Sequence, residues 1–182
     1  MAEHKRKEDA TVINKDQSNM VDQVISVRRV TKVTKGGKRF SFSALVVSGD
    51  QNGRIGLASG KSKEVSSAIA KATNRARKKL IEIPLRGATV AYDVLGKHGS
   101  SKVYIRSASK GTGVIAGGAV RSVMEAAGIK DVLSKSMGSS SRTNVVKAAF
   151  NALAQLRSLQ QIARMRGKTV QEVMKGSHNG NA

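Results

Sequence analysis

The stretch TKVTKGGKRFSFSALVV, residues Thr31–Val47, sets two runs of β-prone residues on either side of the pair Gly36-Gly37. A Gly-Gly pair between such runs predicts a β-hairpin, because the favoured two-residue turns need positive φ angles that glycine adopts without steric cost. On the second run, every other residue from Phe40 to Val46 is apolar, so one face can pack while the other meets solvent. The sequence therefore predicts a basic finger on a packed sheet, with these cations at its tip: Lys32, Lys35, Lys38 and Arg39.

The charge of the whole chain points toward a polyanionic partner. Its 182 residues include 33 Lys and Arg against 12 Asp and Glu, which gives a formal net charge of +21. Such an excess repels itself unless it meets a polyanion, and nucleic acid is the commonest one. A membrane surface is the rival, but no run approaches the roughly 20 apolar residues of a spanning helix, and no lipidation signal is visible. We therefore expect nucleic-acid binding that weakens steeply with salt.

The absence of Cys bears on the compartment. It excludes disulfides and thiolate metal sites and fits a reducing environment. The N-terminus, MAEHKRKEDA, has no apolar core of a secretory signal. These features favour a cytoplasmic protein.

A domain boundary is predicted at Pro84, the only proline, because proline disfavours helical conformation in the residue before it. Residues 20–83 are therefore expected to form one domain and residues 84–175 a second. Residues 1–19 are polar and aperiodic, which is typical of a disordered tail. Residues 176–182 are expected to fray.

The first domain is expected to contain strands followed by one helix. After the hairpin, a turn at Gly49–Gly53 leads to a third strand at Arg54–Ala58. Ser59–Ser62 then leads into a helix that runs to about Leu80, with apolar residues at three- and four-residue spacing.

The second domain begins with two strand-like runs, Thr89–Leu95 and Val103–Ser107, separated by the loop GKHGSS. The glycine-rich loop KGTGVIAGG then opens a helix that Gly128 ends in the expected C-terminal position. No internal repeat is present.

The rest of the second domain is expected to be mostly helical. Ile129–Leu133 is a candidate short strand, and Ser134–Arg142 is expected to be a serine-rich loop. Thr143 is predicted to cap the next helix. Thr169–Glu172 has the capping-box form and predicts a short terminal helix.

Two glycine-containing segments resemble phosphate-binding motifs. In Gly56–Ser62 only three residues separate the outer glycines, where a P-loop needs four. The alternative is a turn into a helix whose free N–H groups and Lys61 hold one nucleic-acid phosphate.

The segment Gly111–Ala116 fits the dinucleotide pattern G-x-G-x-x-A, and Asp131 lies at a suitable distance along the chain. That acid, however, precedes the candidate strand instead of ending it. The alternatives are close backbone packing, or a phosphate or protein contact at the helix start. A nucleotide-dependent enzyme therefore stays as the rival from another functional class.

No catalytic constellation is visible. The histidines His4, His98 and His178 have no obvious partner, although His98 could touch RNA, and the acids are scattered. We expect no catalytic residue, no metal site, no cofactor and no enzymatic activity. The aromatic residues alternate with polar residues on strands, which favours core packing over base stacking: Phe40, Phe42, Tyr92, Tyr104 and Phe150.

Two long runs, VTKVTKGGKRFSFSALVVSGDQNGRIG and GTGVIAGGAVRSVMEAAG, resemble bacterial small-subunit ribosomal protein number five, over about Met20 to Lys175. The resemblance implies an α+β fold. Its N-terminal domain is similar to a double-stranded-RNA-binding fold, with a three-stranded antiparallel sheet and a helix. An α/β domain with a split, left-handed βαβ arrangement follows. After Gly138 an Asn-Pro element is usual in the family, whereas this chain reads Ser139–Thr143.

The resemblance also implies a function as a structural constituent of the cytoplasmic ribosome. Members bind small-subunit rRNA between the head and the body of the particle and contribute to decoding accuracy. They contact small-subunit proteins number four and number eight. The family's spectinomycin-associated loop matches Thr31–Lys38, and its interface with protein four maps near Gly113 and Arg121. No membrane and no small-molecule substrate are implied.

Charge, position and resemblance together define the candidate sites. The expected rRNA-binding residues are Arg28, Lys32, Lys35, Gly36, Gly37, Lys38, Arg39, Arg54, Lys61 and Lys63. The expected protein-contact residues are Gly111, Gly113, Gly117, Gly118 and Arg121. A free double-stranded-RNA-binding or nucleoid protein is the alternative among binding proteins.

Overall fold

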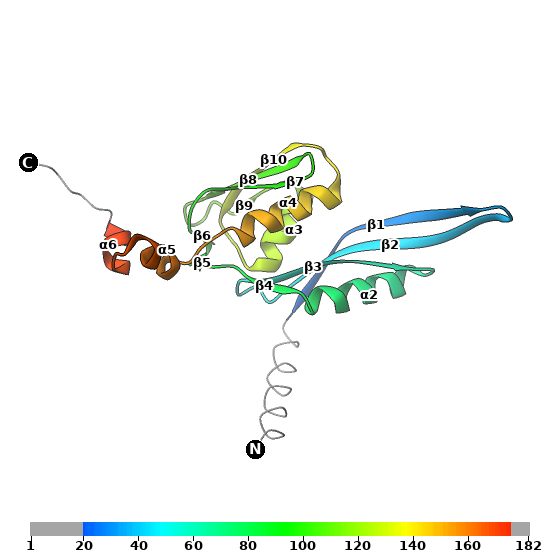
Figure 1. The fold of residues 1–182 in the computed structure, drawn as a ribbon, viewed down its shortest axis with the longest axis horizontal. Coiled ribbons are helices and arrows are strands. Elements are labelled where there is room, and N and C mark those ends of the chain that lie inside the picture. The colour runs from blue at the N-terminus through cyan, green and yellow to red at the C-terminus, as the bar shows by residue number, and fades with distance from the viewer. Residues whose placement is uncertain (1–19, 176–182) are drawn as a thin grey trace, which may run out of the picture.

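The computed structural model describes residues 20–175, arranged as two four-stranded sheets and one two-stranded sheet, with helices packed between and beside the larger sheets (Figure 1). The predictions for residues 1–19 and 176–182, including those for His4 and His178, lie outside the described residues.

The first sheet is antiparallel and contains β1 (Val21–Thr34), β2 (Gly37–Gly49), β3 (Arg54–Ser62) and β4 (Leu80–Glu82), in that order. Helix α2 (Val65–Arg77) packs on one face of this sheet, where its small residues meet β2 in a cluster of buried side chains: Ala44, Val46, Ala68 and Ala72. The described part of this unit therefore has a four-stranded sheet, one strand more than the sequence predicts.

The hairpin forms as predicted, but its turn is shifted by one residue. Thr34 pairs with Gly37, so Lys35 and Gly36 form the turn, and the expected Gly36-Gly37 turn is wrong. The Thr34 hydroxyl donates to the Gly37 carbonyl oxygen at 3.0 Å. Gly37 carries the positive φ of +137°, which a side chain would strain.

Two predictions about the end of this unit are also wrong. The third strand continues to Ser62, so Gly60 and Lys61 lie in β3 and not in a turn before the helix. The strand can pass beneath α2 because Gly60 has no side chain, and a Cβ there would overlap the carbonyl oxygen of Ala68. The helix ends at Arg77, and Leu80 lies in β4 because it pairs with Gly56 of β3.

The second sheet has the order β7 (Val94–His98), β8 (Ser101–Ser107), β10 (Val132–Gly138) and β9 (Val114–Ile115). Strand β9 runs parallel to β10, and the other neighbours are antiparallel. Helix α3 (Gly118–Ala127) connects β9 to β10, and α4 (Arg142–Ala154) packs against β7 and β8.

Several predicted boundaries in this unit are wrong because pairing overrides local composition. Residues 89–95 split between β6 (Thr89–Val90), which pairs with β5 (Leu85–Arg86), and the separate strand β7. Residues 134–138 belong to β10 and not to a loop, since β8 pairs with this serine-containing segment along its length. Ser141, not Thr143, is the N-cap residue of α4.

Near the C-terminus the chain forms α5 (Leu159–Arg166) and α6 (Val170–Lys175), which project from the body at the end opposite the hairpin (Figure 1). The predicted capping box is confirmed, with Thr169 N–H donating to Glu172 and Glu172 N–H donating to the Thr169 hydroxyl. A second capping box, between Ser158 and Gln161, begins α5.

One hydrophobic core joins the two units. Leu45, Val47 and Ile55 of the first sheet belong to the same buried cluster as Val123 and Met124 of α3. Helix α3 contacts β1, β2 and β3, so it lies between the two sheets (Figure 1). Gly128 ends α3 with φ +83°, as predicted for a helix C-terminus.

The turn between β2 and β3 completes this joint. Gln51 N–H donates to the Ala126 carbonyl oxygen at 3.2 Å, and Gly53 N–H donates to that of Ala127 at 3.0 Å. Carbonyl groups in the last turn of a helix lack partners within the helix. The first unit therefore supplies the C-terminal cap of a helix in the second.

Candidate nucleic-acid interface

The β1–β2 hairpin extends beyond its neighbours as a two-stranded finger (Figure 1). Strand β3 ends at Ser62, opposite Phe42, and every residue from Thr31 to Phe40 is exposed. No acidic residue occurs between Asp22 and Asp50. The positive charge of this finger is therefore not neutralised by its own sequence.

The strand register sorts the finger's cations between its two faces, since residues directly opposite one another share a face. Arg28 lies opposite Ser43, which in turn lies opposite Lys61 of β3. Lys32 lies opposite Arg39 in a second row. These rows share the face that turns away from α2, and all four cations are exposed. We call this set the cationic face: Arg28, Lys32, Arg39 and Lys61.

The other face has a different chemistry. Ala44 and Val46 on this face pack against α2, and Phe42 contacts the same cluster. Farther toward the tip, Phe40 is 45% exposed, and the guanidinium carbon of Arg29 lies 3.7 Å from the centre of its ring. Core packing is therefore the wrong prediction for Phe40, because no element of the described chain reaches far enough to cover it.

The other aromatic residues divide in the same way. Phe150 and Tyr92 are partly buried against the main core. Tyr104 is 38% exposed, so core packing is wrong for this residue too. Its hydroxyl donates to Asp93 at 2.9 Å, and this hydrogen bond raises the pKa of Tyr104.

The remaining predicted rRNA-binding residues are not all near the finger's tip. Lys35, Gly36, Gly37 and Lys38 lie at or beside the turn, and Lys63 lies between β3 and α2. Arg54 lies at the opposite end of β3 from Lys61, and its Nε contacts Asp50 Oδ2 at 2.8 Å.

Asp50 organises the turn in which this ion pair lies. Burial alone would raise its pKa, but hydrogen bonds from Asn52 N–H and Arg54 N–H and the Arg54 guanidinium together lower the pKa below its ordinary value. Arg54 therefore has a structural role at the base of the sheet.

The glycine-rich loop before α3 is held from within the protein. Gly111 N–H and Gly113 N–H both donate to Asp131 Oδ1, at 3.0 and 2.9 Å, and Asp131 is only 5% exposed. A dinucleotide phosphate would need free amides at such a loop. Asp131, whose carboxylate a dinucleotide site would use to bind the ribose, instead fixes the loop by accepting these two hydrogen bonds.

The predicted protein-contact residues lie together around this loop. Gly111, Gly117 and Gly118 are exposed, and Gly113 is partly buried. Arg121, in the first turns of α3, donates from Nη2 to the Val114 carbonyl oxygen at 3.0 Å. The structure therefore presents these residues as one exposed loop and helix start.

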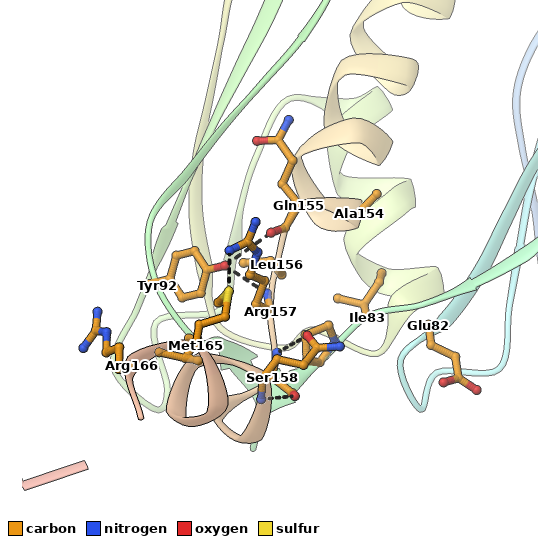
Figure 2. Close-up of a pocket in the computed structure, with 13 residues that line it drawn as sticks. Glu82, Ile83, Tyr92, Ala154, Gln155, Leu156, Arg157, Ser158, Met165 and Arg166 are labelled. Atoms are coloured by element: carbon orange, nitrogen blue, oxygen red, sulfur yellow. Dashed lines mark hydrogen bonds between the residues drawn. The ribbon is translucent and has the colours of Figure 1, made fainter. Parts of the chain in front are cut away.

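A hollow of about 1100 Å³ lies where Pro84, the end of α4 and the start of α5 meet (Figure 2). Figure 2 shows the Tyr92 hydroxyl between the Gln155 carbonyl, to which it donates, and Arg157 N–H, from which it accepts. Among its lining residues Glu82 is the only acid, and none is histidine. Its lining therefore contains no carboxylate pair and no histidine.

Two further findings concern residues 20–175. No group of three or more His, Asp or Glu side chains in this range is placed to hold a metal ion. None of the helices described there is long and apolar enough to cross a lipid bilayer.

Sequence reasoning missed two features of the site. The first is the contact between Arg29 and Phe40. Nothing in the sequence around the adjacent residues Arg28 and Arg29 separates their roles, and only the alternation of side chains along a strand places Arg29 on the same face as Phe40. The second is the hydrogen bonding of the glycine loop to Asp131, which lies about twenty positions further along the chain. The only sequence feature that indicates this contact is an acidic residue just before a strand.

Models of known families match both parts of the chain. The N-terminal domain of ribosomal protein S5 matches residues 20–84, and the C-terminal domain of ribosomal protein S5 matches residues 96–166.

Full-length relatives agree with these matches. Small ribosomal subunit protein uS5 of Flavobacterium psychrophilum is 58% identical over 155 residues, which cover 85% of this chain and 89% of the relative. The uS5 proteins of Syntrophobacter fumaroxidans and a Psychrobacter species are 48% and 50% identical, over 88% and 85% of this chain and 97% and 94% of theirs. The chain therefore belongs to the ribosomal protein S5 family of the small ribosomal subunit, which confirms the resemblance of its two long sequence runs.

Proposed function

We propose that this protein is a structural constituent of the small ribosomal subunit in the cytoplasm and that it binds small-subunit rRNA through its finger. The observation that carries the proposal is the cationic face, where Arg28, Lys32, Arg39 and Lys61 stand in two rows and the sequence between Asp22 and Asp50 contains no acid. Rows of exposed cations on a sheet suit the phosphates of a folded RNA. On β2 the cations are separated by the small side chains of Ser41 and Ser43, which leave room for close approach.

The family suggests finer features that belong to the same proposal. The finger would lie between the head and the body of the particle, with Thr31–Lys38 near the spectinomycin site. The exposed loop at Gly111–Arg121 would contact small-subunit protein number four and through it influence decoding accuracy. Protein number eight is the second proposed neighbour. We also propose the double-stranded-RNA-binding-like fold, the split left-handed βαβ arrangement and the domain boundary at Pro84 on this basis.

The proposed function involves no catalysis and no cofactor. This part of the proposal is supported by Asp131, which accepts hydrogen bonds from the Gly111 and Gly113 amides. A bound dinucleotide would require these amides to be free. Calorimetric titration with NAD or ATP should give no saturable heat. A clear binding isotherm would instead favour the alternative of a nucleotide-dependent enzyme.

The test of rRNA binding compares two double variants with the same change in charge. Lys32→Ala with Arg39→Ala removes one row of the cationic face, whereas Lys102→Ala with Lys135→Ala removes two exposed lysines from β8 and β10. Filter binding to a small-subunit rRNA transcript should show weaker binding for the first pair. Its salt slope should fall by about 1 per lost phosphate contact. The second pair should bind like the parent. Equal salt slopes for all three proteins would show that the finger does not contact the rRNA.

Sedimentation separates the ribosomal protein from a free RNA- or nucleoid-binding protein. At moderate salt the tagged chain should travel with small subunits, and recovery only near the top of the gradient would favour the alternative.

A further inference from the structure

Arg29 and Phe40 form a stacked pair near the end of the finger, on the face opposite the four cations. Arg29 pairs with Phe42 and Phe40 pairs with Thr31, so the two side chains are diagonal neighbours on one face of β1 and β2. The guanidinium carbon lies over the ring, 3.7 Å from its centre, which is well within the range of a cation–π contact. Both residues are exposed.

A purely structural role explains this pair poorly. An exposed cation–π contact adds little stability, and the hydrophobic contacts of α2 include Phe42 but not Phe40. Within the described residues, the Arg29 side chain has no ion pair or hydrogen bond, and no acid occurs from Gln23 to Gly49. Its charge and the outer side of its guanidinium plane therefore remain available to a partner.

The chemistry of that partner follows from what a planar cation on a ring accepts. A guanidinium group stacks flat on aromatic surfaces, and in RNA-binding proteins it does so with unpaired bases. Phe40 fixes the orientation of the plane in advance, which lowers the ordering cost on binding. Lys38 and Thr31 lie on the same face, next to the pair. Lys38 thus offers a cation, and Thr31 a hydroxyl group, beside the pair.

We infer that Arg29, held flat by Phe40, is a stacking platform for one unpaired base of the rRNA. The inference rests on the proposed rRNA binding and deepens it, since the finger then contacts two features of the RNA. The cationic face meets phosphates of a folded segment, and the opposite face holds a single base that has left its helix. One platform of this kind agrees with a chain whose aromatic content is only 3%.

The test separates stacking from charge. Arg29→Lys keeps the charge but removes the plane, and Phe40→Leu keeps an apolar side chain but removes the ring. Phe42→Leu is the matched control, because Phe42 lies on the same strand and face without a cation over its ring. The full-length variants are compared in binding to a small-subunit rRNA transcript over a range of salt, with thermal unfolding followed in parallel.

We expect Arg29→Lys and Phe40→Leu each to bind roughly tenfold more weakly, as for the loss of a base stack, with an unchanged salt slope. Their double variant should bind no more weakly than the worse single variant, because the two residues act as one unit. Phe42→Leu should bind like the parent. Parent-like binding of Arg29→Lys would overturn the inference.

A second outcome would also overturn the inference. If Phe40→Leu lowers the salt slope by about 1, Arg29 meets a phosphate instead of a base. Neither result would contradict the proposed rRNA binding, because that proposal is tested with Lys32 and Arg39. It fails only if the removal of these two side chains leaves the salt slope of binding unchanged.

Discussion

Gly128 shows how a single residue fixes the contact between the two units. Its φ of +83° lies in the left-handed region, and a Cβ at this position would overlap the carbonyl group of Gln51 in the β2–β3 turn. The sequence identifies Gly128 as a helix C-terminal residue from local pattern alone. It cannot reveal the second constraint, because Gln51 is far away in the chain and meets Gly128 only after both units have packed.

Gly128→Ala should therefore destabilise the protein more than left-handed strain alone explains. Gly87 is the matched control, since it has φ +62° but nothing within 4 Å of its added Cβ. We expect a loss of about 1 kcal/mol in the free energy of unfolding for Gly87→Ala, from backbone strain. For Gly128→Ala we expect about 3 kcal/mol or more, because the turn must also move. Urea unfolding measures both, and equal losses would contradict the packing argument.

At the scale of elements, local signals predict structure well where a segment's own residues decide it. The finger, helix α2 up to its last turn, the helix end at Gly128 and the capping box at Thr169 all follow from patterns a few residues long. Strand β10 does not, because serine and lysine at 134–136 carry no strand signal. Pairing with β8 makes this segment a strand, whereas β9 pairs only with Val132 and Leu133 at the start of β10.

The two faces of the finger can likewise be predicted only in part from the sequence. Alternation along β2 predicts that its two sides differ, and the sequence places the cations near its tip. The assignment of Lys61 to the row of Arg28 depends on the register between β2 and β3, which a one-residue slip would reverse. Only the paired sheet reveals which cations share a face.

The turn of the finger yields a prediction at this scale. Gly37 needs its positive φ, whereas Gly36 has no positive φ and has open space around an added Cβ. Gly37→Ala should therefore distort the hairpin and weaken binding to the rRNA transcript, because the cations near the turn lose their register. Gly36→Ala should leave the fold unchanged. Backbone NMR shifts of residues 31–40 report the distortion, and parent-like shifts in Gly37→Ala would contradict the assigned turn.

Considered as a whole, the molecule links its two candidate surfaces through α3. This helix starts at the exposed glycine loop with Arg121 and ends against the β2–β3 turn, whose amides cap Ala126 and Ala127. The Gln23 amide of β1 also donates to Glu125 of α3 at 3.1 Å. A contact at the glycine loop is thus connected to the base of the finger through one rigid element, and the match of two separate family domains does not imply two independent bodies.

This continuity predicts that the two units unfold together. The core cluster runs through both sheets, and separating them would expose Leu45, Val47 and Ile55 together with the buried side of α3. Scanning calorimetry of the full chain at moderate salt should therefore give one transition, with equal calorimetric and van't Hoff enthalpies. Gly49→Ala, whose Cβ would overlap the Ala126 carbonyl, should weaken the joint and broaden or split the transition, whereas Gly36→Ala should not. Two resolved transitions in the parent protein would mean that the shared core does not couple the units, and the finger would then move independently of the glycine loop.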